Sequence, residues 1–419
     1  MNILMSLVGV FTLLLIGFLL SNNKKAINKR TVFGALAIQA AFGGFVLYVP
    51  VGKDILKTVS DKVSSVIGYA SDGIGFLFGD LAHFKLGFIF AVNVLPVIIF
   101  FSSLIAVLYY LGIMQWIIRI IGGGLQKALG TSRTESMSAT ANIFVGQTEA
   151  PLVVRPFIAT MTNSELFAIM VGGLASIAGS VLAGYAQMGV PIEFLVAASF
   201  MAAPGGLLMA KLMHPETETP KNDMDELPED PDKPANVIDA AAAGASSGMH
   251  LALNVGAMLL AFVGLIAMLN GIIGGVGGWF GIEGLTLELI LGYIFMPLAF
   301  LIGVPWNEAL VAGSFIGQKI VVNEFVAYLN FVPYLKDVAD GGMVIAETGL
   351  PMTARTQAII SFALCGFANL SSVAIILGGL GAMAPNRRHD LARLGIRAVI
   401  AGSLSNLMSA TLAGLFLAI

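Results

Sequence analysis

The sequence predicts an all-α polytopic membrane protein with about eight transmembrane helices, two re-entrant helical hairpins, interfacial helices and inverted repeats. Charged residues make up 11% of the chain, against roughly 25% in soluble domains. Hydrophobic residues make up 57%, and the mean hydropathy is +0.89. The net charge of -3 offers no basic footprint for nucleic acid. The single cysteine excludes an internal disulfide and a cysteine-built metal site.

Long windows without Asp, Glu, Lys or Arg predict the spans, since a helix needs about 20 apolar residues to cross the hydrocarbon. One window, 289–307, contains Pro297, Gly303 and Pro305 and is interpreted as part of a broken re-entrant element. Eight predicted spans remain. Their windows are 1–23, 31–52, 86–118, 166–192, 194–210, 240–282, 356–386 and 398–419.

Basic residues orient the predicted spans. The first window has no basic residue before it, which favours a mature span over a signal peptide. Lys24, Lys25, Lys29 and Arg30 follow that span, so this loop is expected to be cytoplasmic. A second basic cluster, at 387–393, precedes the last span and falls on the same side. We therefore expect a multi-pass protein of the cell inner membrane with both termini outside the cytoplasm.

Two polar segments interrupt the spans. Residues 53–85 alternate apolar and charged side chains at helical spacing, which predicts an amphipathic interfacial helix, with a second short apolar piece around 74–79. Within residues 214–239, eight acidic residues lie at 216–233 and four prolines at 220–234, which predicts a solvated cytoplasmic loop.

Two further regions are too charged to cross lipid as ordinary helices, yet each is long enough for a re-entrant hairpin. They are 119–165 and 308–350. The residues Phe-Val-Gly-Gln at 144–147 match Phe-Ile-Gly-Gln at 315–318, and a carboxylate follows each match. An apolar span rich in small and polar residues follows each hairpin candidate. Backbone groups freed by such breaks survive in a membrane only where protein or cargo satisfies them.

A hairpin followed by a broken helix, occurring twice in opposite orientation, indicates a transporter built from inverted repeats. The predicted organisation is a scaffold (1–118), a first repeat (119–213), the acidic loop (214–239), a long scaffold span (240–282) and a second repeat (283–419). A passive channel is a weaker interpretation. An integral-membrane enzyme is not expected, because no histidine cluster or nucleophile motif is present.

The motifs resemble those of concentrative nucleoside transporters of the bacterial eight-span form. The resemblance rests on Gly-Gln-Thr-Glu-Ala-Pro-Leu at 146–152, Asn-Glu-Phe-Val-Ala-Tyr at 323–328, and Gly-Phe-Ala-Asn at 366–369 followed by Ser371 and Ser372. It implies a homotrimer whose transport domain moves like an elevator past a fixed scaffold, and cargo such as uridine. The implied nucleoside-binding residues are Gln147, Thr148, Glu149, Val181, Glu324, Phe367, Asn369 and Ser372.

The resemblance also implies a co-transported sodium ion near the first hairpin tip. Its ligands would be the side chains of Asn142 and Ser176 and the carbonyls of Val145 and Ile177. Proton coupling stays open as an alternative, as does an elevator carrier for another small polar solute. A dicarboxylate carrier would need fixed cations at 366–372, and none is present there. Lys319 and Arg155 are interpreted as charge-balancing or snorkelling residues rather than substrate ligands.

The chemistry of these residues suits a nucleoside. Gln147 and Thr148 can donate to and accept from a base edge, and Phe367 offers an aromatic face. A carboxylate such as Glu324 accepts strongly from ribose hydroxyls. No arginine or lysine cluster is available to clamp a phosphate, which favours nucleosides over nucleotides.

Overall fold

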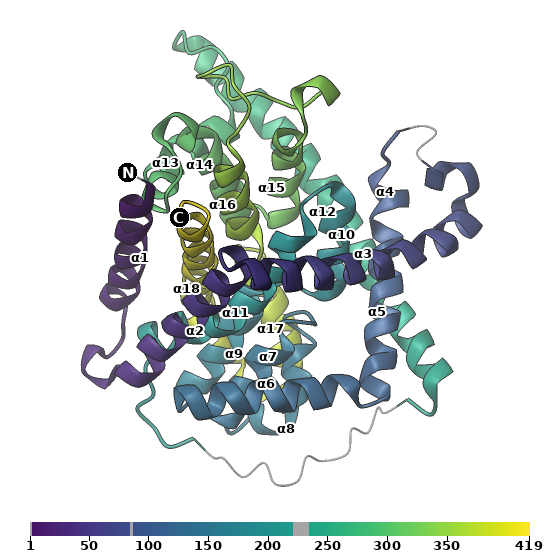
Figure 1. Cartoon of the computed structure of the whole chain (residues 1–419), viewed down its shortest axis with the longest axis vertical. Coiled ribbons are helices and arrows are strands. Elements are labelled where there is room, and N and C mark those ends of the chain that lie inside the picture. Colours follow the sequence, from purple (N-terminus) through teal and green to yellow (C-terminus); the bar gives the residue numbers. More distant parts are fainter. Residues whose placement is uncertain (1, 84–86, 221–233) are drawn as a thin grey trace.

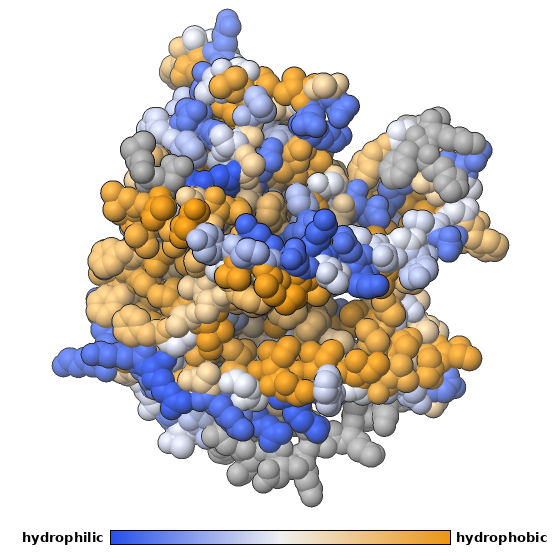
Figure 2. All heavy atoms as spheres, viewed as in Figure 1, coloured by the Kyte–Doolittle hydropathy of each residue, from blue (hydrophilic) through white to orange (hydrophobic). Residues whose placement is uncertain are grey.

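The computed structural model describes residues 2–83, 87–220 and 234–419, and these residues are almost entirely helical (Figure 1). Within these ranges the only β pairing is an isolated bridge between Val344 and Pro351. The prediction of an all-α membrane protein is confirmed. Figure 2 shows apolar side chains covering broad areas of the flanks, as expected for a surface in contact with lipid.

Six helical segments of the described chain, two of them with a short break, are long and apolar enough to cross a membrane, and the sharply bent pair Leu287–Leu301 and Trp306–Val321 would make a seventh. The other two predicted spans are shorter: α1 (Asn2–Leu19) has 18 residues, and the 356–386 window divides into α16 (Ala354–Leu364) and α17 (Ser372–Met383). The six are α2 (Lys29–Leu47), α4 with α5 (Phe90–Asn93 and Leu95–Tyr110), α9 with α10 (Asn163–Ala175 and Gly179–Met188), α11 (Ile192–Met213), α12 (Val237–Trp279) and α18 (Arg388–Phe416).

The predicted amphipathic helix is α3 (Pro50–Phe78), which lies across the upright helices in Figure 1. Proline suits its first turn because the missing N–H needs no partner there. Leu56, Ile67 and Ile74 are buried, while the lysines between them face outwards. The prediction of a separate apolar piece around 74–79 is wrong, because α3 continues unbroken to Phe78 and the short η2 (Gly79–His83) follows.

The first hairpin is shorter than predicted. The span expected over 86–118 ends at Tyr110, and α6 (Ile113–Leu129) then runs as a separate helix after Gly112 turns the chain at φ 76°. Apolar residues in this helix extended the charge-free window past the true end of the span. The hairpin itself comprises α7 (Arg133–Ala141), a tip at 142–149, η3 (Ala150–Val154) and α8 (Arg155–Ile158).

The second hairpin follows a sharp bend. α13 (Leu287–Leu301) and α14 (Trp306–Val321) meet at 117° around Gly303, whose φ of 108° favours glycine. The returning limb is α15 (Glu324–Phe331) with η4 (Val332–Leu335). The hairpins enter from opposite ends of the molecule: α6 and α7 lie near the bottom of Figure 1, and α13 and α14 near the top.

The tetrapeptide match does not mark equivalent positions. Residues 144–147 lie in the non-helical tip of the first hairpin, whereas residues 315–318 lie inside the continuous helix α14. Both hairpins are present, but the sequence match between them is out of register.

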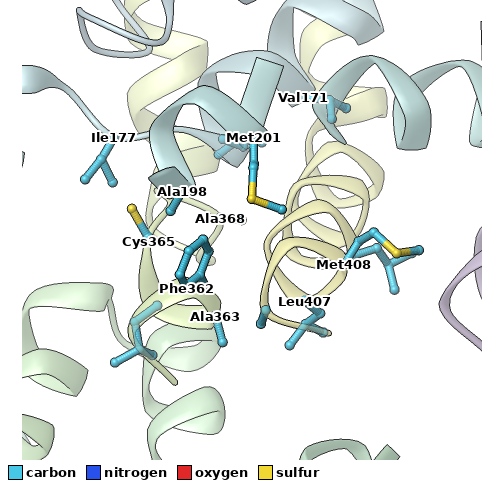
Figure 3. Close-up of a cluster of buried hydrophobic side chains, with 14 of the residues drawn as sticks. Val171, Ile177, Ala198, Met201, Phe362, Ala363, Cys365, Ala368, Leu407 and Met408 are labelled. Carbon is cyan, nitrogen blue, oxygen red and sulfur yellow. The ribbon is translucent and has the colours of Figure 1, made fainter. Parts of the chain in front are cut away.

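The centre of the molecule is apolar. Met201 of α11, Phe362 of α16, and Leu407 and Met408 of α18 pack together beside the helix breaks (Figure 3). At the lower end, Arg30 donates to Ala128 O at 3.2 Å, and Asn386 donates to Ala159 O at 3.3 Å. The two basic clusters thus share one end of the molecule, as the topology predicts. Of the acidic loop, residues 221–233 lie outside the described residues.

Candidate functional site

The first hairpin tip is an unwound segment held against the break between α9 and α10. α7 ends at Ala141, and Gly179 N donates to Phe144 O at 2.9 Å across to the break. A Cβ added to Gly173 would lie 2.8 Å from Cβ of Gln147, so α9 must carry glycine there for the tip to approach. The tip and the break therefore form one unit.

Some oxygen atoms of this unit accept no hydrogen bond from the described residues. Asn142 is buried, and its Oδ1 accepts no hydrogen bond from the described residues. Ser176 lies in extended backbone after α9, and its Oγ donates to Gly172 O at 3.0 Å. Val145 and Ile177 are buried on either side of the contact. A buried oxygen without a donor is costly unless something else binds it.

A second group of polar side chains connects hairpin 2 to the break between α16 and α17. Glu324, the first residue of α15, is 4% exposed. Its Oε2 accepts from Asn369 Nδ2 at 2.9 Å. Asn369 Oδ1 in turn accepts from Ser372 N at 2.9 Å, so the three residues predicted to bind ribose are brought together.

Tyr185 completes this group, and the sequence interpretation missed it. Its hydroxyl donates to Glu324 Oε1 at 3.0 Å, and the side chain is fully buried. Tyr185 follows Val181 by one helical turn of α10, so the two share a face. A lone tyrosine in an apolar span needs a partner for its hydroxyl, and that was the available signal.

The remaining predicted residues lie between the two groups. Phe367 is half-buried, and its N donates to Ser176 O at 3.1 Å, which joins the two helix breaks directly. A Cβ added to Gly379 of α17 would lie 2.7 Å from Thr148 Cγ2, so the first tip also touches the second broken helix. Glu149 is exposed, and its Oε2 accepts from Gly146 N at 2.7 Å. Gln147 Oε1 accepts no hydrogen bond from the described residues.

Lys319 does not pair with Glu324 as an ion pair. Its Nζ donates instead to Asn406 Oδ1 at 2.8 Å, and within the described ranges no carboxylate oxygen lies within 4.0 Å of it. Two hairpin tips and two helix breaks thus converge on one buried polar region, with free acceptors on one side and a carboxylate network on the other. Such a region can bind a neutral solute that carries both donors and acceptors, together with a small cation.

The chain is similar to known transporters along its whole length. Models described as the N-terminus and C-terminus of Na+ dependent nucleoside transporters match residues 8–81 and 194–414, and a nucleoside-recognition model matches 91–192. The nucleoside permease NupC of Helicobacter pylori is 53% identical, covering 99% of this chain and 98% of that one.

Solved structures show the same similarity. CNTnw in an inward-facing substrate-bound state is 63% identical with a TM-score of 0.93, covering 99% of this chain and 98% of that chain. A double variant of CNTnw in an outward-facing state is 62% identical with a TM-score of 0.95, covering 100% and 99%.

Proposed function

This chain belongs to the Na+-dependent nucleoside transporter family, so it is a multi-pass membrane carrier for nucleosides and not an enzyme. We propose that it is a sodium-coupled symporter that imports nucleosides such as uridine. The observation that carries the proposal is the pair of unused buried acceptors, Asn142 Oδ1 and Gln147 Oε1, at a tip that touches both helix breaks. Asn142 Oδ1 suits a cation, and Gln147 Oε1 suits a hydrogen-bond donor on the edge of a nucleobase.

Sodium is assigned to the corner between the first tip and the first break. Sodium is a hard cation that takes oxygen ligands. Asn142 Oδ1, Ser176 Oγ and the carbonyls of Val145 and Ile177 would supply them. The carbonyl ends of α7 and α9 also concentrate negative partial charge at this corner. The gradient is adequate as a driving force, because one charge moved through 100 mV releases about 2.3 kcal/mol.

The nucleoside is assigned to the space between the two groups. Gln147, Thr148 and Glu149 would meet the base edge, and Val181 and Phe367 would flank its ring. Glu324, Asn369 and Ser372 would bind the ribose hydroxyls. The contact between Tyr185 and Glu324 supports this assignment, because it fixes the carboxylate and leaves acceptor capacity for a hydroxyl.

Movement is assigned to the two repeats as a body, past a scaffold that includes α12. Only 17% of the apolar window of α12 is buried, and Leu260, Trp279 and Phe280 are more than three-quarters exposed. By contrast, 94% of the window over α9 and α10 is buried. The exposed face of α12 supports a homotrimer in which copies of this helix pack together, with the cytoplasm on the side of the acidic loop.

The test is uptake into liposomes that contain the purified protein. We expect uridine to accumulate only when sodium is higher outside, because the ion and the nucleoside share one set of helix breaks. Accumulation that follows an imposed proton gradient with sodium absent would reject sodium and favour proton coupling. Accumulation of another polar solute, with no response to uridine, would reject the substrate assignment. Liposomes without protein provide the control.

A further inference from the structure

A buried lysine lies in the second repeat, in the corner that corresponds to the one with the free Asn142 Oδ1 in the first repeat. Lys319, in the last turn of α14, is 2% exposed. Its only described hydrogen bond is the one to Asn406 Oδ1 at 2.8 Å. A charged group in such a position is costly unless nearby groups favour the positive charge.

Asn406 connects that lysine to both helix breaks. Its Nδ2 donates to Ala175 O at 2.6 Å and to Cys365 O at 3.0 Å. Ala175 is the last residue of α9, and Cys365 follows the last residue of α16. A Cβ added to Gly366 would collide with Asn406 Oδ1, so a glycine is needed beside this bridge.

The electrostatics of helix ends explain why a cation belongs here. The last four carbonyls of a helix lack intrahelical partners, and the C-terminus carries roughly half a negative charge. Three such ends converge on Lys319: its own helix α14, and α9 and α16 through Asn406. Both Lys319 and Asn406 are 2% exposed, so little water reaches the pair. The low dielectric strengthens the attraction.

The proposed sodium ion and the ammonium of Lys319 lie in corresponding corners of the two repeats. In the first repeat the corner lies between the ends of α7 and α9, where a Cβ on Gly172 would lie 3.3 Å from Asn142 Nδ2. In the second repeat it lies between the ends of α14 and α16, where Leu370 N donates to Ile320 O at 3.1 Å. The first corner has the free Asn142 Oδ1, and the second has the ammonium of Lys319.

We infer that Lys319 is a tethered cation that takes the place of a second sodium ion, so that one sodium ion, bound at the first hairpin, accompanies each nucleoside. This inference rests on the proposed sodium coupling. Lys319 would then determine how many sodium ions accompany each nucleoside, because a neutral side chain at this position would leave the three helix ends without a positive charge. A neutral variant that leaves space would then admit a second sodium ion.

The test is uridine binding by the purified protein, measured calorimetrically at several sodium concentrations with choline replacing sodium. Below sodium saturation, linkage makes the Kd rise about tenfold for each tenfold fall in sodium when one ion is coupled, and about 100-fold when two are coupled. We expect the one-ion slope for wild type and for Lys319→Arg, and the two-ion slope for Lys319→Ala and Lys319→Gln.

Each other outcome has a definite meaning. A wild-type slope of zero rejects the sodium coupling of the proposed function and this inference with it. A one-ion slope in the folded neutral variants overturns this inference alone, as does their failure to bind uridine at any sodium concentration. A two-ion slope in wild type also overturns it. If the neutral variants do not fold, the wild-type slope and the charge moved per uridine in liposomes decide the question, and one charge per uridine is expected.

Discussion

Glu324→Gln is the substitution that tests the ribose side of the site most directly. The wild-type carboxylate is 4% exposed and accepts from Tyr185 and Asn369 at 3.0 and 2.9 Å. Glutamine has the same shape but only one acceptor oxygen, and its amide donates. Since both protein neighbours are donors, the variant cannot accept from both of them and from a ribose hydroxyl as well.

The expected loss follows from the bond that disappears. A hydrogen bond to a charged group is worth about 1.5–3 kcal/mol. Removing one such bond to the ribose should weaken uridine binding about 10- to 150-fold. The protein should stay folded, because the amide oxygen introduced at position 324 can take the place of Oε1 and still accept from the hydroxyl of Tyr185.

Isothermal titration of uridine at saturating sodium measures the effect, with the melting temperature of the ligand-free protein as the check on folding. Glu288→Gln is the matched control. The carboxylate of Glu288 also accepts from an amide, Nδ2 of Asn270 at 2.9 Å, but it lies at the start of α13. A folded Glu324→Gln protein whose Kd is within about twofold of wild type would refute the reasoning, and a comparable loss in the control would show the effect to be nonspecific.

Three further changes test other parts of the structure. Asn142→Ala should raise the sodium concentration needed for half-maximal uridine binding at least about tenfold, because it removes a buried oxygen to which no described residue donates; an unchanged sodium titration would contradict the site. Gly366→Ala should lower the melting temperature by several degrees, since its Cβ would collide with the Asn406 oxygen; an unchanged melting temperature would show that the bridge can relax. Burial and the positive charges of Arg397, Lys211 and Arg393 lower the pKa of His214 from 6.5 to about 4. Between these two pH values His214 is protonated in the unfolded chain but neutral in the folded protein. The free energy of unfolding should therefore fall as the pH drops from 6.5 towards 4. His214→Asn should reduce the loss of melting temperature between about pH 7 and pH 5, and an equal loss in both proteins would contradict this role.

The sequence alone determined the class of the protein and most of its spans. Windows without charge are a strong signal because hydrocarbon penalises every charged group, whatever the neighbouring helices do. The same rule located the interrupted regions. Small and polar residues in the spans that follow them, including Asn369 and Ser372, indicated the two breaks. It failed where an apolar surface helix adjoined a span, as α6 adjoins α5, because both environments favour the same residues.

Only the tertiary structure decided which polar groups meet. Tyr185 and Glu324 are 139 positions apart, and Lys319 and Asn406 are 87 apart. Residues 144–147 and 315–318 read alike, yet one set lies in a tip and the other in a helix. Local patterns record only whether a residue faces lipid, water or protein. Which carbonyl, carboxylate or ammonium lies opposite depends on how the helices pack and where each one breaks, and that is fixed by contacts across the whole chain.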